Sequence, residues 1–289
     1  MIEGVSACLS SGTNSAYLYA LCGEEDYLPR TTHAANFGTA GFLLSTASYA
    51  AIYQYFSLKG LLVATVLSGA AGFLCTLFLR PEPHGGVPMA RKKRTPCSQL
   101  RLLLRDGQAR LFTLLLSLFS VAWLLVNFFY AEILTRRGVP LAWLSAIIIA
   151  YSLAQMLAEP LVRLCGKCSK RRLTLLFCLL SGAALLGFGL LRGTVALILL
   201  MVLTPLLLDL ASIHVEQQQN RLIDALALKG DRAAALSFMN IGVNLMEILS
   251  LFASSIFVAA GIGWCFGLCG TLLMLCVLLF RCKIKRQSA

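Results

Sequence analysis

Long apolar segments dominate the chain and alternate with short polar stretches. Nine such segments can be distinguished, at about residues 3–22, 34–56, 59–80, 110–132, 141–164, 173–192, 194–216, 235–260 and 264–282. Each is close to the roughly 20 residues that a helix needs to cross the hydrocarbon core of a bilayer. Strands of a membrane barrel would alternate in polarity, whereas these segments are continuously apolar. The pattern therefore predicts an all-α polytopic membrane protein with nine transmembrane helices.

A long polar and basic stretch divides these segments into a group of three and a group of six. We expect residues 1–80 to form a partial N-terminal helical bundle, residues 81–109 a basic cytoplasmic linker, and residues 110–289 a C-terminal six-helix bundle. Within the linker, residues 99–105 are apolar at several positions and basic at Arg101 and Arg105, which predicts a short amphipathic helix on the inner leaflet. An acidic turn at residues 24–26 is expected to join the first two spans.

Composition excludes a water-soluble globule, because 58% of the residues are hydrophobic, only 13% are charged and the mean hydropathy is +0.79. The net charge of +12 indicates topology and does not indicate a nucleic-acid partner. With the linker inside, all but four of the 25 Lys and Arg residues lie on cytoplasmic segments, and the exceptions are Lys59, Arg136, Arg137 and Arg192. The positive-inside rule then predicts a multi-pass protein of the plasma (inner) membrane, with the C-terminus cytoplasmic and the N-terminus of this chain outside. Membrane lipids are its expected partners.

Polar groups within the spans follow a period of three. The third, sixth and ninth spans contain no amide, carboxylate or imidazole group, while each of the other six contains at least one. Polar groups in lipid are costly and usually face a bundle interior or a water-filled cavity. We therefore expect every third helix to lie on the periphery and the other helices to line a common path.

Two carboxylates and eight other polar or aromatic residues are the candidates for function along this path. Glu247 and Asp209 are candidates for proton or ion coupling, since both are expected within the hydrocarbon depth, although a neutral or hydrogen-bonded acid without a role in turnover is the alternative. Glu216 shares the face of Asp209, but we expect it near the inner mouth, solvated or paired with Arg221. The substrate-path candidates are Asn14, Tyr17, Trp123, Asn127, Tyr130, Gln155, Asn240 and Asn244.

Local sequences add a family resemblance. The small-residue and Tyr pattern of residues 11–19 and the sequence Asn220-Arg221-Leu222-Ile223, followed by Arg232-Ala233, resemble parts of the major facilitator superfamily of secondary transporters. The pattern of spans resembles the architecture of that family, which has two six-helix halves, a long cytoplasmic loop between them and the third helix of each repeat on the periphery. The resemblance implies a chain that lacks the first three helices of the family. It also implies the inner-gate candidates Arg163, Gly166, Lys167, Asn220, Arg221 and Arg232.

The sequence departs from the family pattern at three places. Asn14 and Ala20 replace acidic residues of the fourth-helix pattern, Arg163 stands where the gate motif usually has Asp, and the second span carries no proline-glycine motif of drug antiporters. The expected function is secondary active transport of a small solute by alternating access, with protons as the candidate coupling ion. The alternative is a non-transporting truncated remnant or membrane scaffold.

An intramembrane enzyme is not expected. Such an enzyme needs a nucleophile with a base or a metal cluster, and the sequence has only three His residues. Cys165 and Cys168 have the spacing of a redox or metal pair, but no second Cys or His pair accompanies them on their loop. We therefore expect no cofactor and no metal.

Overall fold

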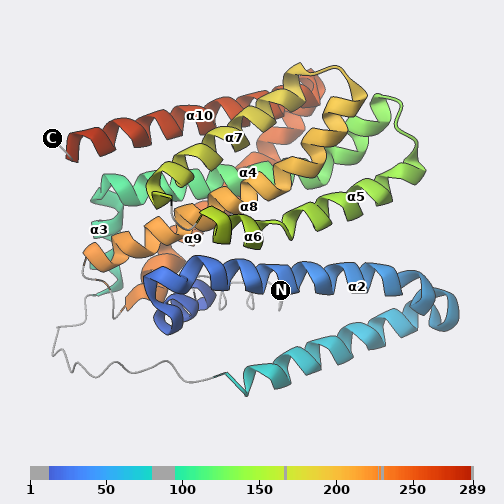
Figure 1. Ribbon diagram of the computed structural model, residues 1–289, viewed down its shortest axis with the longest axis horizontal. Coiled ribbons are helices and arrows are strands. Elements are labelled where there is room, and N and C mark those ends of the chain that lie inside the picture. Colours follow the sequence, from blue (N-terminus) through green and yellow to red (C-terminus); the bar gives the residue numbers. More distant parts are fainter. Residues whose placement is uncertain (1–12, 80–94, 166–167, 227, 229–230, 288–289) are drawn as a thin grey trace.

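The computed structural model describes residues 13–79, 95–165, 168–226, 228 and 231–287, and all regular structure in this part is helical (Figure 1). The helices are α2 (Thr13–Thr76), α3 (Pro96–Arg105), α4 (Gly107–Arg136), α5 (Leu141–Gln155), α6 (Ala158–Leu164), α7 (Lys170–Leu190), α8 (Thr194–Ala225), α9 (Arg232–Ala260) and α10 (Ile262–Gln287).

Seven helical segments of the described part are long and apolar enough to cross a membrane. They are Ile52–Thr76, Gly107–Arg136, Trp143–Leu164, Lys170–Leu190, Thr194–Ala225, Arg232–Ala253 and Ile262–Leu279. The predicted class of an all-α polytopic membrane protein is thereby confirmed, while the count of nine spans stays a prediction. Residues 3–12 of the first predicted span lie outside the described residues.

The long element α2 is three helical segments joined at single residues. The backbone leaves helical geometry only at Gly23 (φ 70°, ψ −175°) and Ser57 (φ 56°, ψ −165°). The predicted acidic turn at residues 24–26 is therefore wrong, since the helix resumes directly after Gly23. Acidic side chains at this position suit the start of a helix, where the helix dipole favours negative charge.

Helices α4 and α8 form the centre of the C-terminal bundle, and their neighbours are distributed unequally around them. α7 and α10 make the most extensive contact with each other, whereas α2 contacts α5, α6, α8 and α9. In Figure 1, α7 and α10 accordingly lie on one side of the bundle and α2 on the opposite side. The expectation that the sixth and ninth spans lie on the periphery of the bundle stays a prediction.

Glycines allow the close approach of α7 and α10. The Gly182 and Gly270 backbones face each other, and a Cβ atom at Gly270 would lie 2.8 Å from the Gly182 carbonyl oxygen. Gly189 and Gly263 meet in the same way one step further along the pair, where a Cβ atom at Gly189 would lie 2.9 Å from the Gly263 carbonyl oxygen. Small residues at such crossings are a general device of membrane helix packing, because association there depends on close van der Waals contact.

The linker segment contains the predicted short helix. α3 spans Pro96–Arg105, with Leu103 buried and both Arg101 and Arg105 exposed. Asp106 follows it and caps α4, accepting hydrogen bonds from the backbone N–H groups of Gln108 (2.8 Å) and Ala109 (2.7 Å). α4 consequently begins at Gly107, three residues before the predicted start of its span. The position of α3 on the inner leaflet stays a prediction.

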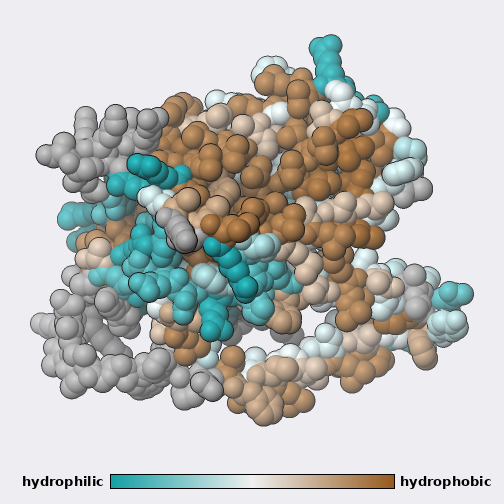
Figure 2. Space-filling model, in the orientation of Figure 1, coloured by the Kyte–Doolittle hydropathy of each residue, from teal (hydrophilic) through white to brown (hydrophobic). Residues whose placement is uncertain are grey.

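The surface separates by polarity. Figure 2 shows hydrophilic residues gathered where the start of α2 meets α6 and the end of α8, while hydrophobic residues cover α5, α7 and α10. At the opposite end of the bundle, the loop after α4 contacts the loop between α7 and α8, where Arg137 donates to the carbonyl oxygen of Arg192 (3.4 Å). The hydrophobic belt between these ends is what a surrounding bilayer requires.

Candidate transport pathway

A cavity of about 500 Å³ lies between α2 and the C-terminal bundle. α2 contributes Asn14, Ser15 and Tyr27 to its lining, and the facing wall comes from α4, α8 and α9, with Glu216 and Asn240 among its residues. Two of the predicted substrate-path residues, Asn14 and Asn240, thus meet across this space. The cavity joins polar groups that are far apart in the sequence, in a volume suited to a small molecule.

Glu216 accepts a hydrogen bond from a fully buried tyrosine of α2. The Tyr27 side chain is 0% exposed, and its hydroxyl group lies 3.3 Å from Glu216 Oε2 and 2.8 Å from Ser15 Oγ. Burial and the neighbouring carboxylate both raise the pKa of the Tyr27 phenol above its usual range, so the residue is neutral and donates to Glu216. The expected pairing of Glu216 with Arg221 is wrong, because Arg221 forms its ion pair with Glu24.

Asp209 lies farther along the same side of α8, next to a second cavity. Gln155 Nε2 donates to Asp209 Oδ2 at 2.7 Å. Gln155 also lines a space of about 310 Å³ between α5 and α2. Asp209 and Glu216 are seven residues apart, or about 10 Å along the helix axis. The two carboxylates therefore follow one another along the space between α2 and the C-terminal bundle.

At one end of this space, Arg232 is the centre of a polar network. It forms an ion pair with Asp224, donates to Asn220 Oδ1 (3.2 Å) and lies 4.1 Å above the centre of the Tyr19 ring. Tyr19 in turn donates to Asp224 Oδ2 (3.3 Å), and Asn220 Nδ2 donates to Ser15 Oγ (3.2 Å). The start of α2 is thereby attached to the end of α8 and the start of α9.

Two further sets of contacts attach α2 to the same end of the bundle. Gln217 Nε2 donates to the carbonyl oxygen of Glu24 (2.8 Å), beside the Glu24–Arg221 ion pair. Glu159 of α6 accepts from Asn36 Nδ2 (3.0 Å) and lies 3.1 Å from His33 Nδ1. The predicted inner-gate residues Asn220, Arg221 and Arg232 therefore all take part in contacts with α2.

Arg163 is in a different position from these three residues. It is exposed and forms its ion pair with Glu159, one turn earlier on the same helix (2.5 Å), so it reaches α2 only through this shared carboxylate. Gly166 and Lys167, the remaining inner-gate candidates, lie outside the described residues.

The other candidates are spread over the bundle. Glu247 of α9 accepts a hydrogen bond from Ser120 of α4, and Ser120 is one turn from Trp123 on the same helix. Asn127 and Asn244 are exposed, and the Asn127 amide donates to its own helix at the Trp123 carbonyl (3.0 Å). Tyr130 packs against the hydrophobic core, and Tyr17 is partly buried.

Several residues of the pathway were not among the predicted candidates. Ser15 and Tyr19 lie inside the pattern of residues 11–19 that carried the family resemblance, so that pattern could have indicated them. Glu24 was assigned to the acidic turn, and Tyr27 lay between the first two predicted spans. In the structure both follow the single-residue kink at Gly23 and contact α8. Asp224 was placed beyond the end of a span, whereas α8 continues to Ala225.

The chain was compared with protein-family models and with curated proteins. The family model of the Major Facilitator Superfamily matches residues 1–215. That range includes all of α2, the linker, and α8 as far as one residue before Glu216. None of the curated proteins matches the chain.

Proposed function

The chain belongs to the Major Facilitator Superfamily, whose members are membrane transporters and not enzymes, and from this premise we propose that it carries out secondary active transport of a small solute. The proposed mechanism is alternating access, in which α2 and the C-terminal bundle move relative to one another about the space between them. One observation carries the proposal most directly. The cavity of about 500 Å³ between α2 and the bundle contains a partly buried carboxylate, Glu216, with amide groups around it.

Protons are the proposed coupling ions. A carboxylate within the hydrocarbon depth costs several kcal/mol unless it is protonated, paired or hydrated. Asp209 accepts a hydrogen bond from an amide, and Glu216 accepts one from a phenol. Within the described residues neither carboxylate forms an ion pair, so a proton or a cationic solute can supply the missing positive charge. Glu247, with its Ser120 donor, is a third candidate for the same role.

We propose that the contacts of Arg232, Arg221 and Asn220 with α2 close the inner end of this pathway. All of them join α2 to one end of the bundle, the end where α3 and the first turn of α7 are rich in Arg and Lys. The positive-inside rule assigns that end to the cytoplasm of an inner membrane. Opening of the cavity to the cytoplasm would require these contacts to separate.

Transport in reconstituted vesicles tests the proposal. The purified protein is incorporated into proteoliposomes that contain a pH-sensitive dye, and a panel of small solutes is screened for solute-dependent proton movement. We expect a solute that moves protons with the wild type, and loss of the movement in Glu216→Gln or Asp209→Asn. Glu132→Gln is the matched control, since Glu132 is also on a membrane helix but pairs with Arg136 one turn away (2.5 Å).

Each outcome has a defined meaning. Unchanged proton movement in both Glu216→Gln and Asp209→Asn would exclude these carboxylates from coupling. Transport of solute without proton movement would support the transport function and would exclude protons as the coupling ions. The absence of transport for every solute, in vesicles that retain folded protein, would contradict the proposed function and favour a scaffold.

A further inference from the structure

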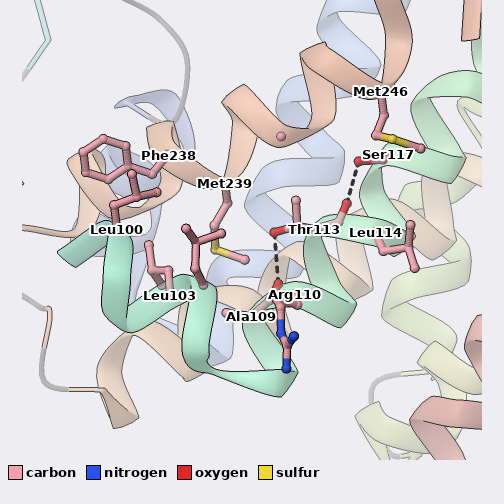
Figure 3. A pocket seen from close by; sticks show the side chains of 12 residues that line it. Leu100, Leu103, Ala109, Arg110, Thr113, Leu114, Ser117, Phe238, Met239 and Met246 are labelled. Atoms are coloured by element: carbon pink, nitrogen blue, oxygen red, sulfur yellow. Dashed lines mark hydrogen bonds between the residues drawn. The ribbon is translucent and has the colours of Figure 1, made fainter. Parts of the chain in front are cut away.

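A separate apolar cavity of about 280 Å³ lies between the linker helix α3 and the membrane helices α4 and α9 (Figure 3). Leu100, Leu103 and Leu104 of α3 and Leu114 of α4 form one side, and Phe238 and Met246 belong to α9. Leu100, Leu104 and Leu114 are 38%, 60% and 37% exposed, so the cavity opens to the outside of the bundle. It contains none of the pathway carboxylates.

The hydroxyl groups in this lining are used internally. Thr113 Oγ1 donates to the Ala109 carbonyl oxygen (3.0 Å), and Ser117 Oγ donates to the Thr113 carbonyl oxygen (2.8 Å), as the dashed lines in Figure 3 show. Both groups are thereby turned back to their own helix. The cavity consequently presents an almost wholly apolar wall, which favours a hydrocarbon occupant over a polar solute.

Positive charge flanks the same cavity. Arg110 lines it, and in Figure 3 its guanidinium extends away from the apolar side chains. Arg101 and Arg105 are exposed on α3, which forms one wall. Within the described part of the chain none of these three arginines forms an ion pair.

The acidic residues nearby are engaged elsewhere. Asp106 accepts from the first backbone amides of α4, and Asp231 accepts from Gln99 Nε2 (2.8 Å). The arginines around the cavity are therefore free to meet an anionic group of a ligand.

We propose that this cavity binds an anionic phospholipid, with an acyl chain between α3, α4 and α9 and the headgroup phosphate against Arg105 and Arg110. A helix that lies at the membrane surface brings its apolar side chains to the boundary between headgroups and acyl chains, which is where such a lipid is found. Guanidinium groups bind phosphate through paired hydrogen bonds. The bound lipid holds α3, and with it the linker, against the C-terminal bundle.

Lipid titration of the purified chain tests the site. Native mass spectrometry in detergent measures binding of dioleoylphosphatidylglycerol, dioleoylphosphatidylcholine and glycerol 1-phosphate. We expect phosphatidylglycerol to bind about tenfold more tightly than phosphatidylcholine, and glycerol phosphate not to bind detectably. Arg105→Gln with Arg110→Gln should weaken phosphatidylglycerol binding roughly 10- to 30-fold, on the basis of the usual contribution of each basic residue near anionic lipid.

Two controls separate the headgroup contact from the acyl contact and from general charge. Arg171→Gln with Arg172→Gln removes two exposed arginines of α7 away from the cavity and should change the affinity less than about threefold, because screened charges at a distance contribute little. Met246→Trp fills the cavity and should reduce binding of both lipids, with the arginines intact.

Equal affinity for the two lipids would overturn the proposal. An equal loss in the α7 control pair, or unchanged binding in Met246→Trp, would overturn it as well. Gel filtration identifies any variant that does not fold, and the comparison of the two lipids on the wild type stands without the variants.

Discussion

Replacement of Gly270 by alanine should separate α7 from α10. A Cβ atom at this position would lie 2.8 Å from the Gly182 carbonyl oxygen, 2.9 Å from the Leu186 backbone nitrogen and 3.1 Å from Leu185 Cβ. Two of these three atoms are backbone atoms of α7 and cannot rotate away. The helices must therefore move apart by several tenths of an ångström, and overpacking of this kind costs ~1–3 kcal/mol.

Gly267 provides a matched control one turn earlier on α10. A Cβ atom there would have no heavy atom within 4 Å. Alanine favours a helix over glycine by roughly 0.5–1 kcal/mol, and this gain applies at both positions. The difference in stability between Gly270→Ala and Gly267→Ala therefore measures the contact cost alone.

Buried cysteines on the same two helices provide the assay. Cys178 of α7 and Cys269 and Cys276 of α10 are free and no more than 5% exposed. A thiol-reactive fluorescent dye added during heating reports their exposure. We expect Gly270→Ala to lower the midpoint by about 2–12 °C relative to Gly267→Ala, taking the cost of ~1–3 kcal/mol and roughly 2–4 °C per kcal/mol. Equal midpoints, or a higher midpoint for Gly270→Ala, would refute the close packing described for α7 and α10.

Three further predictions concern α2. Ser57→Gly should raise the unfolding midpoint by the equivalent of about 1 kcal/mol, because Ser57 has a positive φ of 56° that glycine adopts without strain; a lower midpoint would contradict this. Glu24→Arg should weaken the attachment of α2, and the added Arg221→Glu should restore it. The coupling energy in this double-mutant cycle should be below ~1 kcal/mol, because the ion pair is partly exposed. Purely additive effects of the two substitutions would show that the ion pair does not stabilise the attachment. Above pH 10, stability should fall in the wild type more steeply than in Tyr27→Phe, since the raised pKa of Tyr27 means that its contribution is present below pH 10 and is lost as the phenol ionises; parallel pH profiles would exclude Tyr27.

The sequence predicted the class of the fold well, because apolar length and charge asymmetry report directly on the bilayer. It also predicted the helix over residues 99–105, where apolar and basic positions alternate with the helical period. The acidic turn was wrong because charged residues after a span read as a loop. In the structure, one residue in a conformation open to glycine changes the direction of the helix, and the charged residues begin the next segment.

The candidate pathway could be predicted only in part. Asn14, Gln155 and Asn240 were recognisable as amide groups within apolar spans, and they do line the two cavities. Tyr27 carries no such signal, since a tyrosine near the end of a span usually anchors a helix at the membrane interface. Its contact with Glu216 joins residues that are 189 positions apart in the sequence, and no local sequence pattern indicates such a long-range contact.

Arg232 makes its ionic contact with α8 and only a weaker contact with α2. The ion pair between Arg232 and Asp224 lies entirely within α8 and α9, whereas α2 meets this pair through the ring and hydroxyl group of Tyr19. If α2 moves away, the charged pair remains intact, and no isolated charge of the kind that costs ~3–5 kcal/mol is left buried. The bonds that break include those of the hydroxyl groups of Ser15 and Tyr27, each worth about 0.5–1.5 kcal/mol, and the partly exposed ion pair between Arg221 and Glu24, worth ~0–1 kcal/mol. In the proposed closure, the Arg232–Asp224 pair therefore stays assembled when α2 separates from the bundle, and it does not have to form again when α2 returns.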